Sequence, residues 1–309
     1  MKSLKIKMMK LYLYTFILLS IILTGCKTTI TDSTIVKLKD TIDVYVVLLA
    51  GQSNMAGAGN FDALDIEAIE RIKNVSNRVA LSYNGGKVKP LSYYDNTPSE
   101  KYDFIKRFGP ELFMGLTLAE NNPKQEFLFI KRSQGGTALY GAWNPKWTLE
   151  KAKAVEKEQK QDVQLYNTHI EDIRANLKAL EAQGKSYKII GLAWMQGEND
   201  AAKEVSATTY ESNLKILIKS YRDEFDVEDM PCVIGQINSK YGNFKAGPNM
   251  VRQAMEDVAQ SDKNVEVIKT TTDTSWSDYP KHADNVHYNA EGQRRLGIAF
   301  GEQLIILNK

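Results

Sequence analysis

Short apolar runs alternate with segments of helical periodicity along most of the chain. The first run, residues 44–50, is aliphatic almost throughout, which is typical of a strand buried on both faces of a parallel sheet. Alternation of this kind predicts a three-layer α/β/α sandwich with a mainly parallel central sheet, as in flavodoxin-like folds. Strands are predicted at 44–50, 78–83, 126–131, 188–195, 232–237 and 265–270. Helices are predicted at 61–73, 110–121, 149–183, 208–225, 249–261 and 290–307, with a loop over 83–106.

Small and polar residues follow several of these predicted strands. Ser53 comes just after the first strand, behind a glycine, Gly51, that can turn the chain with a positive φ. Gly135 and Gln196 occupy similar places after later strands. The carboxyl ends of parallel strands meet at one sheet edge, where open α/β sheets carry their chemistry. Ser53 is therefore either a nucleophile or the N-cap of a short helix.

The first 41 residues have the composition of a targeting segment. Four lysines precede an apolar stretch at 11–23, which is too short to span a bilayer and ends in Leu23-Thr24-Gly25-Cys26. This ending resembles the lipobox of bacterial lipoproteins. We expect a signal peptide at 1–25, lipidation of Cys26, a polar tether over 26–41 and a single domain over 42–309. The protein would be exported and anchored to a bacterial membrane by lipid alone, and an uncleaved signal anchor is the alternative.

The remaining composition is that of an ordinary globular protein. Hydrophobic residues make up 43% of the chain and charged residues 25%, and the formal net charge of +2 indicates no preference for nucleic acid. Besides Cys26, the only cysteine is Cys232, which lies in an apolar run and is expected to be a buried hydrophobic residue. Two cysteines allow neither a disulfide framework nor a zinc cluster.

Two of the three histidines lie in one predicted loop before the last helix. His282 and His287 flank Asp284, which precedes His287 by three residues and can reach its Nδ1 in a turn. The carboxylate would then hold the imidazole in the tautomer that offers Nε2 to a serine. Solvated loop residues that cap the last helix are the alternative. The third histidine, His169, belongs to a charged helix and is expected at the surface.

In combination these segments resemble the SGNH hydrolase superfamily. Within it, the chain is similar to carbohydrate esterases that include acetylxylan esterases and sialate O-acetylesterases. The blocks that carry the resemblance are Gly51-Gln52-Ser53-Asn54-Met55, Gly135-Gly136-Thr137, Trp194-Met195-Gln196-Gly197-Glu198 and Asp284-Asn285-Val286-His287.

The resemblance implies a role for each of these residues. Ser53 would attack an acetyl carbonyl, with His287 as general base and then acid, and with Asp284 orienting the imidazole. Glu198 is the alternative third member of the triad, or a plain residue at a helix start. The oxyanion would be held by the N–H groups of Ser53 and of Gly135 or Gly136, together with a side-chain amide. That amide would come from Gln196, with Asn199 of the Gly-Glu-Asn-Asp string as second choice.

Substrate contacts are predicted for two residues near these blocks. Gln52 precedes the serine, and Trp143 lies in an aromatic loop over 140–147 just after the glycine pair. Aromatic side chains there suit the apolar faces of sugar rings, and they equally suit core packing.

The sequence thus predicts a serine esterase that removes O-acetyl groups from carbohydrate through an acyl-enzyme, without metal or organic cofactor. Acetylated xylan, another plant polysaccharide and O-acetylated sialic acid are all open as substrates. A lipase-like esterase of the same superfamily is one alternative, although its long apolar groove has no clear signal in the sequence. A carbohydrate-binding lipoprotein without activity is another, although a binding protein has no need of Ser53, Asp284 and His287 together.

Overall fold

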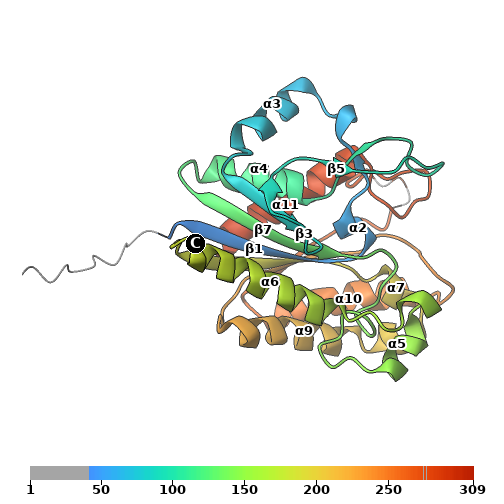
Figure 1. The fold of residues 1–309 in the computed structure, drawn as a ribbon. Coiled ribbons are helices and arrows are strands. Elements are labelled where there is room, and N and C mark those ends of the chain that lie inside the picture. Colours follow the sequence, from blue (N-terminus) through green and yellow to red (C-terminus); the bar gives the residue numbers. More distant parts are fainter. Residues whose placement is uncertain (1–41, 274, 276) are drawn as a thin grey trace, which may run out of the picture. The chain divides into compact units, whose positions relative to one another are not determined.

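The computed structural model describes residues 42–273, 275 and 277–309. The expected signal peptide, the lipidated Cys26 and the tether lie outside the described residues. A seven-stranded sheet forms the centre, in the order β10-β9-β8-β1-β7-β3-β4, and every neighbouring pair is parallel except β3 and β4 (Figure 1). The strands are β1 (Val44–Gly51), β3 (Val79–Tyr83), β4 (Lys89–Pro90), β7 (Glu126–Ser133), β8 (Tyr187–Met195), β9 (Cys232–Gly235) and β10 (Val265–Ile268). The predicted α/β/α fold is confirmed.

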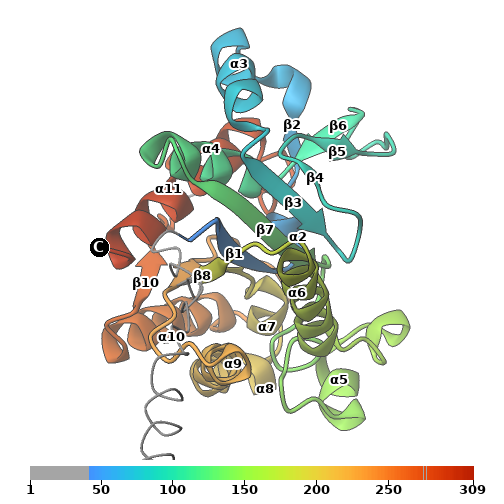
Figure 2. The same ribbon diagram turned by 60° about the vertical axis from the view of Figure 1, so that its left-hand side comes forward.

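Helices cover both faces of this sheet (Figures 1 and 2). One face carries α3 (Ile66–Val75), α4 (Glu111–Asn121) and α11 (Ala290–Leu307). The other carries α6 (Leu165–Ala182), α9 (Tyr210–Phe225) and α10 (Gly247–Ser261). Shorter helices are α2 (Ser53–Ala56), α5 (Leu149–Val155), α7 (Glu198–Ala201) and α8 (Glu204–Thr208), with 3₁₀ turns at Phe61–Ala63 and Glu158–Lys160. Within the described part of the chain, no helix combines the length and apolar character needed to span a bilayer.

The first strand is buried on both faces, as its aliphatic sequence predicts. Val46 and Leu48 pack under α6 and α9, whereas Val47 and Leu49 face α4 and α11, and all four are 0% exposed. Burial of each such side chain contributes about 1.5–3 kcal/mol to folding. The strand that leads to Ser53 is therefore held rigidly from both sides.

The surface position expected for His169 is wrong. Its ring is fully buried, with Nε2 donating to the Ile130 carbonyl at 3.1 Å and Nδ1 accepting from the Tyr221 hydroxyl at 2.7 Å. Burial lowers the pKa of His169 to about 4, so the ring is neutral at physiological pH. The charged face of α6 points to solvent, but this histidine belongs to its inner face.

A small antiparallel sheet lies over the short helix α2. It consists of β2 (Gly59–Asn60), β6 (Lys106–Phe108) and β5 (Tyr94–Asp95). β5 lies inside the segment predicted as loop and forms a hairpin with β6, which begins where that segment ends. Strands of two or three residues have no readable periodicity. The hairpin is hydrogen-bonded to the end of α2. The Tyr94 hydroxyl donates to the Ala56 carbonyl, and Arg107 Nε donates to the Gly57 carbonyl at 2.6 Å.

Candidate active site

Ser53 begins α2 directly beyond the carboxyl end of β1. Gly51 ends the strand with φ +157°, and a Cβ there would lie 2.1 Å from the Met195 carbonyl oxygen of the neighbouring strand, so only glycine fits. Gln52 occupies the N-cap position, which leaves Ser53 inside the first turn and excludes the N-cap alternative. Within the described part of the chain, the Ser53 hydroxyl has no hydrogen-bond partner, and the residue is partly exposed.

The glycine pair after β7 lies against this serine. A Cβ on Gly135 would be 3.4 Å from the Cβ of Ser53. The Lys160 ammonium donates to the Gly135 carbonyl and, at 3.2 Å, to the Gly136 carbonyl. Because carbonyl and N–H point in opposite directions across a trans peptide, the Gly136 N–H points away from Lys160. Neither this N–H nor that of Ser53 has an acceptor among the described residues. Two free donors around a serine are what an oxyanion hole requires.

Asp284 and His287 meet inside one tight loop. Asp284 Oδ2 lies 2.7 Å from His287 Nδ1, while Oδ1 accepts the backbone N–H groups of Val286 at 2.9 Å and His287 at 3.0 Å. Although burial raises it, the hydrogen bonds from the His287 N–H and from the Lys101 ammonium bring the pKa of Asp284 well below its usual range. The carboxylate is therefore ionised at neutral pH, in position to hold the imidazole with Nδ1 protonated.

The side chain of Asn54 joins the serine turn to the histidine loop. Its Nδ2 donates to the Val286 carbonyl at 3.1 Å, and its Oδ1 accepts the Tyr288 N–H at 3.2 Å. These two partners flank His287 on either side. Ser53 and His287 form no direct hydrogen bond in this structure, and apo active sites commonly tighten such contacts only on substrate binding. Sequence reasoning assigned no role to Asn54, although it lies next to the serine.

Glu198 contacts Asn54 rather than His287. Its Oε1 accepts from Asn54 Nδ2 at 2.7 Å, the residue is 2% exposed, and burial raises the pKa of this carboxyl. Its other oxygen is buried without a partner among the described residues. The alternative in which Glu198 orients the histidine does not match this geometry. Glu198 instead holds the amide that positions the histidine loop.

Gln196 is fully buried, and its amide is already occupied. Its Nε2 lies within hydrogen-bonding distance of Gln52 Oε1 (3.1 Å), the Thr137 carbonyl (3.0 Å) and Asp200 Oδ2 (2.6 Å). Two amide hydrogens cannot serve an oxyanion in addition to these acceptors. In this structure the amide of Gln196, the predicted oxyanion donor, is thus committed to acceptors within the protein.

Gln52 and Asn199 are the other side-chain amides among the predicted site residues. Gln52 Oε1 accepts from Gln196 and lies 3.4 Å from the Asn199 backbone N–H, which fixes the orientation of the Gln52 amide. The Asn199 side chain is partly exposed, and its Nδ2 contacts the Val155 carbonyl only at the 3.5 Å limit. The NH₂ group of each of these two side chains has fewer hydrogen-bond partners than that of Gln196.

Two buried carboxylates that sequence reasoning did not single out hold the loop after the glycine pair. Asp200 accepts the N–H groups of Leu139 at 2.7 Å and Tyr140 at 3.0 Å, and burial raises its pKa to about 7. Glu156 accepts the N–H groups of Ala138 at 2.8 Å and Ala142 at 3.0 Å. The loop is thus fixed through its backbone.

The predicted substrate contact by Trp143 is wrong. Its side chain is 0% exposed and packs edge-to-face on Trp194, with ring centroids 5.3 Å apart. A ring enclosed in the core has no face to offer a sugar. The packing alternative is the one the structure has, and Cys232 is likewise buried as expected.

A protein-family model matches most of the chain. The model is described as a carbohydrate esterase, sialic acid-specific acetylesterase, and it matches residues 43–306. The chain belongs to this family. The protein is thus a carboxylic ester hydrolase that acts on O-acetylated carbohydrate. None of the curated proteins matches this esterase significantly.

Solved structures share the fold of the esterase at low sequence identity. A protein from Arabidopsis thaliana superposes with a TM-score of 0.62 at 19% identity, covering 86% of this chain and 99% of its own. NanS gives a TM-score of 0.57 at 15% identity, with 86% and 97% covered. A carbohydrate acetylesterase from Xanthomonas citri gives 0.55 at 16% identity, with 84% of this chain and 55% of that longer chain covered.

A cation that sequence reasoning missed lies against the Asp–His pair of the esterase. Lys101, from the hairpin loop between β5 and β6, places its ammonium 2.9 Å from Asp284 Oδ2 and 3.1 Å from His287 Nδ1. Burial lowers the pKa of His287; Asp284 raises it, and the charges of Lys101 and Arg107 lower it further. The Tyr102 ring lies edge-on to the imidazole, with centroids 6.3 Å apart. No motif marks Lys101, because the contact joins segments far apart in the chain.

A buried ion pair supports the serine turn of the esterase from below. Lys131 Nζ lies 2.6 Å from Glu111 Oε2, and both side chains are 0% exposed. The same ammonium donates to the Ala56 carbonyl at 3.2 Å, and Glu111 Oε1 accepts the Gly109 N–H at 3.0 Å. The carboxyl end of α2 is therefore hydrogen-bonded to a buried ammonium group that has no access to solvent.

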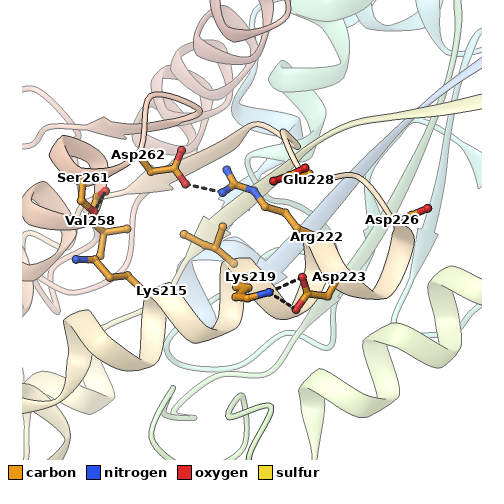
Figure 3. Close-up of a pocket in the computed structure, with 10 residues that line it drawn as sticks. Lys215, Lys219, Arg222, Asp223, Asp226, Glu228, Val258, Ser261 and Asp262 are labelled. Carbon is orange, nitrogen blue, oxygen red and sulfur yellow. Dashed lines mark hydrogen bonds and ion pairs between the residues drawn. The ribbon is translucent and has the colours of Figure 1, made fainter.

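A pocket of about 660 Å³ lies between α9 and α10, away from this site (Figure 3). The end of α9 leads into the start of β9, so the pocket belongs to the sheet edge opposite Ser53. Four of its charged lining residues form ion pairs: Lys219 pairs with Asp223 at 2.6 Å, and Arg222 pairs with Asp262 at 2.5 Å. The pocket has no chemistry that the esterase reaction would use.

Proposed function

We propose that this carbohydrate esterase removes acetyl groups by serine catalysis with Ser53, His287 and Asp284. The Ser53 oxygen attacks the acetyl carbonyl carbon while His287 Nε2 takes its proton. The tetrahedral oxyanion is held by the N–H groups of Ser53 and Gly136. Collapse breaks the bond to the sugar oxygen, which leaves with the proton from His287. His287 then takes a proton from water, whose oxygen attacks the carbonyl carbon of the acetyl-serine. The bond from that carbon to the Ser53 oxygen breaks, the serine oxygen takes the proton from His287, and acetic acid is released and ionises to acetate.

The connection through Asn54 is the observation that carries this proposal. An Asp-x-x-His loop by itself could be a solvated helix cap. Here the residue after Ser53 binds both neighbours of His287, so the loop is held in register with the serine. Gln52 or Asn199 is the side-chain amide that can add a third donor. A binding protein without activity would not need these parts together.

Release of acetate from a panel of substrates tests the function and identifies the sugar. Acetylated xylan, other acetylated polysaccharides and O-acetylated sialosides form the panel, with an activated aryl acetate as reference. Among these, we favour acetylxylan or a related acetylated glycan, and the sialoside is the main alternative. Saturable glycan binding without any acetate release would support the binding-protein alternative instead.

We further propose that Cys26 is lipidated and that residues 1–25 are removed. The basic start, the short apolar stretch and Leu-Thr-Gly-Cys support this. Cys26→Ser should move the protein from the membrane fraction to the soluble fraction, and mass spectrometry of the wild type should find an acylated Cys26 at the N-terminus. An intact Met1 end in native membranes would contradict the proposal.

The charge of Lys101 should influence the pH below which activity is lost, because it acts on the pKa of His287. The imidazole must be neutral to accept the serine proton, so activity rises as pH rises through its pKa. Loss of the nearby cation favours the imidazolium, and Lys101→Met should therefore raise the apparent pKa in the kcat/KM profile. Lys106→Met is the matched control, because its ammonium lies in the same hairpin but pairs with Asp62 at 2.7 Å. An unchanged profile for Lys101→Met would refute the assignment.

A further inference from the structure

A second cavity, of about 560 Å³, lies between the end of β3 and the β5 hairpin. Three tyrosines, Tyr83, Tyr93 and Tyr94, form its walls, and we call it the tyrosine cavity. Lys87, Lys89 and Asp95 are among its polar lining residues. Its size falls within the range of small-molecule sites. None of its lining residues belongs to the proposed triad or oxyanion hole.

We propose that the tyrosine cavity is a subsite for a sugar ring of the glycan chain, distinct from the ring that carries the reacting acetyl group. The proposal rests on the proposed function, because it assumes that the acetyl ester is hydrolysed at Ser53. It extends that function by naming how the rest of the glycan is held.

The aromatic walls are fixed before a ligand binds. The rings of Tyr83 and Tyr94 lie 5.1 Å apart, and Lys131 Nζ lies 4.7 Å from the first ring centroid and 5.5 Å from the second. Tyr93 packs on Phe61 with centroids 5.0 Å apart and is 38% exposed. Rings that are already held lose little conformational freedom on binding, which favours affinity.

The lining combines aromatic faces with charged groups, which suits a sugar better than a lipid. Aromatic faces accept the apolar side of a pyranose, while ammonium and carboxylate groups can bind its hydroxyls. An acyl chain would form no hydrogen bond with the exposed charged ends of Lys87, Lys89 and Asp95. Two lysines against one aspartate also favour a sugar that carries a carboxylate over a neutral one.

The cavity borders the serine turn through two of its walls. The Tyr94 hydroxyl donates to the carbonyl of Ala56, the last residue of α2, and Ser53 is the first residue of that single turn. One helical turn rises about 5 Å. Tyr83 lies on the other wall, and its hydroxyl is 3.4 Å from Ser133 Oγ, just before the glycine pair. A ring in the cavity and an acetyl group at Ser53 can thus belong to one glycan chain.

Tyr93→Ala tests the subsite without disturbing the serine turn, because Tyr93 makes no hydrogen bond to α2 among the described residues. Its kcat/KM on an acetylated xylo-oligosaccharide should fall about fivefold to thirtyfold through KM, as expected for loss of one stacking contact of 1–2 kcal/mol. Its kcat/KM on an aryl acetate should not change. Tyr241→Ala is the matched control, since Tyr241 is 41% exposed and lies outside the cavity. Equal kinetics of the two variants on the oligosaccharide would overturn the proposal.

Binding measured by calorimetry separates this proposal from the catalytic one. Ser53→Ala protein should bind deacetylated xylo-oligosaccharide, more tightly when the oligosaccharide bears glucuronic acid, and Tyr93→Ala in the same background should weaken binding by a similar factor. Binding that depends on Tyr93 in a wild type that releases no acetate would refute the catalysis but keep the subsite. If the wild type releases acetate but its glycan binding does not depend on Tyr93, the catalytic proposal stands and the subsite is refuted. Equal affinity for neutral and acidic chains would overturn the charge preference.

Discussion

Replacement of Ser53 by alanine should lower turnover of an aryl acetate by a factor on the order of a thousand or more. The hydroxyl would form the covalent bond to the acetyl group, and the N–H groups of Ser53 and Gly136, which have no acceptor among the described residues, would hold the oxyanion. The variant should fold as the wild type does, because the hydroxyl has no hydrogen-bond partner that the change would remove. Initial rates and thermal unfolding of both proteins, measured side by side, check this expectation.

His287→Ala and the double variant provide the control for a shared mechanism. The histidine variant should fall nearly as far as the serine variant, and the double variant little further, because residues that act as one unit lose activity non-additively. A folded Ser53→Ala protein that keeps most of its activity would show that the nucleophile lies elsewhere. Losses that simply multiply would show that the two residues act separately.

Asp284→Asn should cost at least a hundredfold in kcat. The amide keeps an oxygen for the N–H groups of Val286 and His287, so the loop should stay closed. However, an amide nitrogen toward Nδ1 would stabilise the tautomer in which Nε2 carries the proton, and that tautomer cannot accept the serine proton. The variant thus separates the orientation of the imidazole from the shape of the loop.

Glu198→Gln is the matched comparison for this change. The glutamine oxygen can still accept from Asn54 Nδ2, so the histidine loop should keep its position and kcat should fall less than about tenfold. Rates of both variants and an aryl acetate pH profile distinguish the two carboxyls. If Glu198→Gln lost more activity than Asp284→Asn, the third member of the triad would be Glu198.

Elements with strong local signals could be read from the sequence. The predicted last helix matches α11 at both ends, because its apolar spacing is regular and the Asn289 side chain caps the Gly292 N–H. The predicted helix over 149–183 is instead two helices, since Glu156 is extended and turns its carboxylate inward to the loop at Ala138. That break depends on a tertiary hydrogen bond, which does not alter the spacing of apolar residues in the sequence.

The same distinction applies to the proposed site. The contact of Asp284 with His287 spans three residues and could be anticipated from spacing. The orientation of the Gln196 amide depends on Gln52, Thr137 and Asp200, three partners from different segments, and spacing cannot indicate which of several acceptors an amide will meet. Likewise, Lys101 reaches Asp284 only because the β5–β6 hairpin folds over the histidine loop.

The buried ion pair of Lys131 and Glu111 restricts which amino-acid substitutions the protein can accept during evolution. Loss of either partner leaves a lone charge with no access to water, a defect of about 3–5 kcal/mol that consumes much of the stability of a typical domain. Joint replacement by apolar residues of similar volume would cost far less, but it would still withdraw the donor to Ala56. Single mutational steps away from the pair are therefore deleterious in either order. The two positions should be inherited together, so that descendants of this protein keep both residues or exchange both.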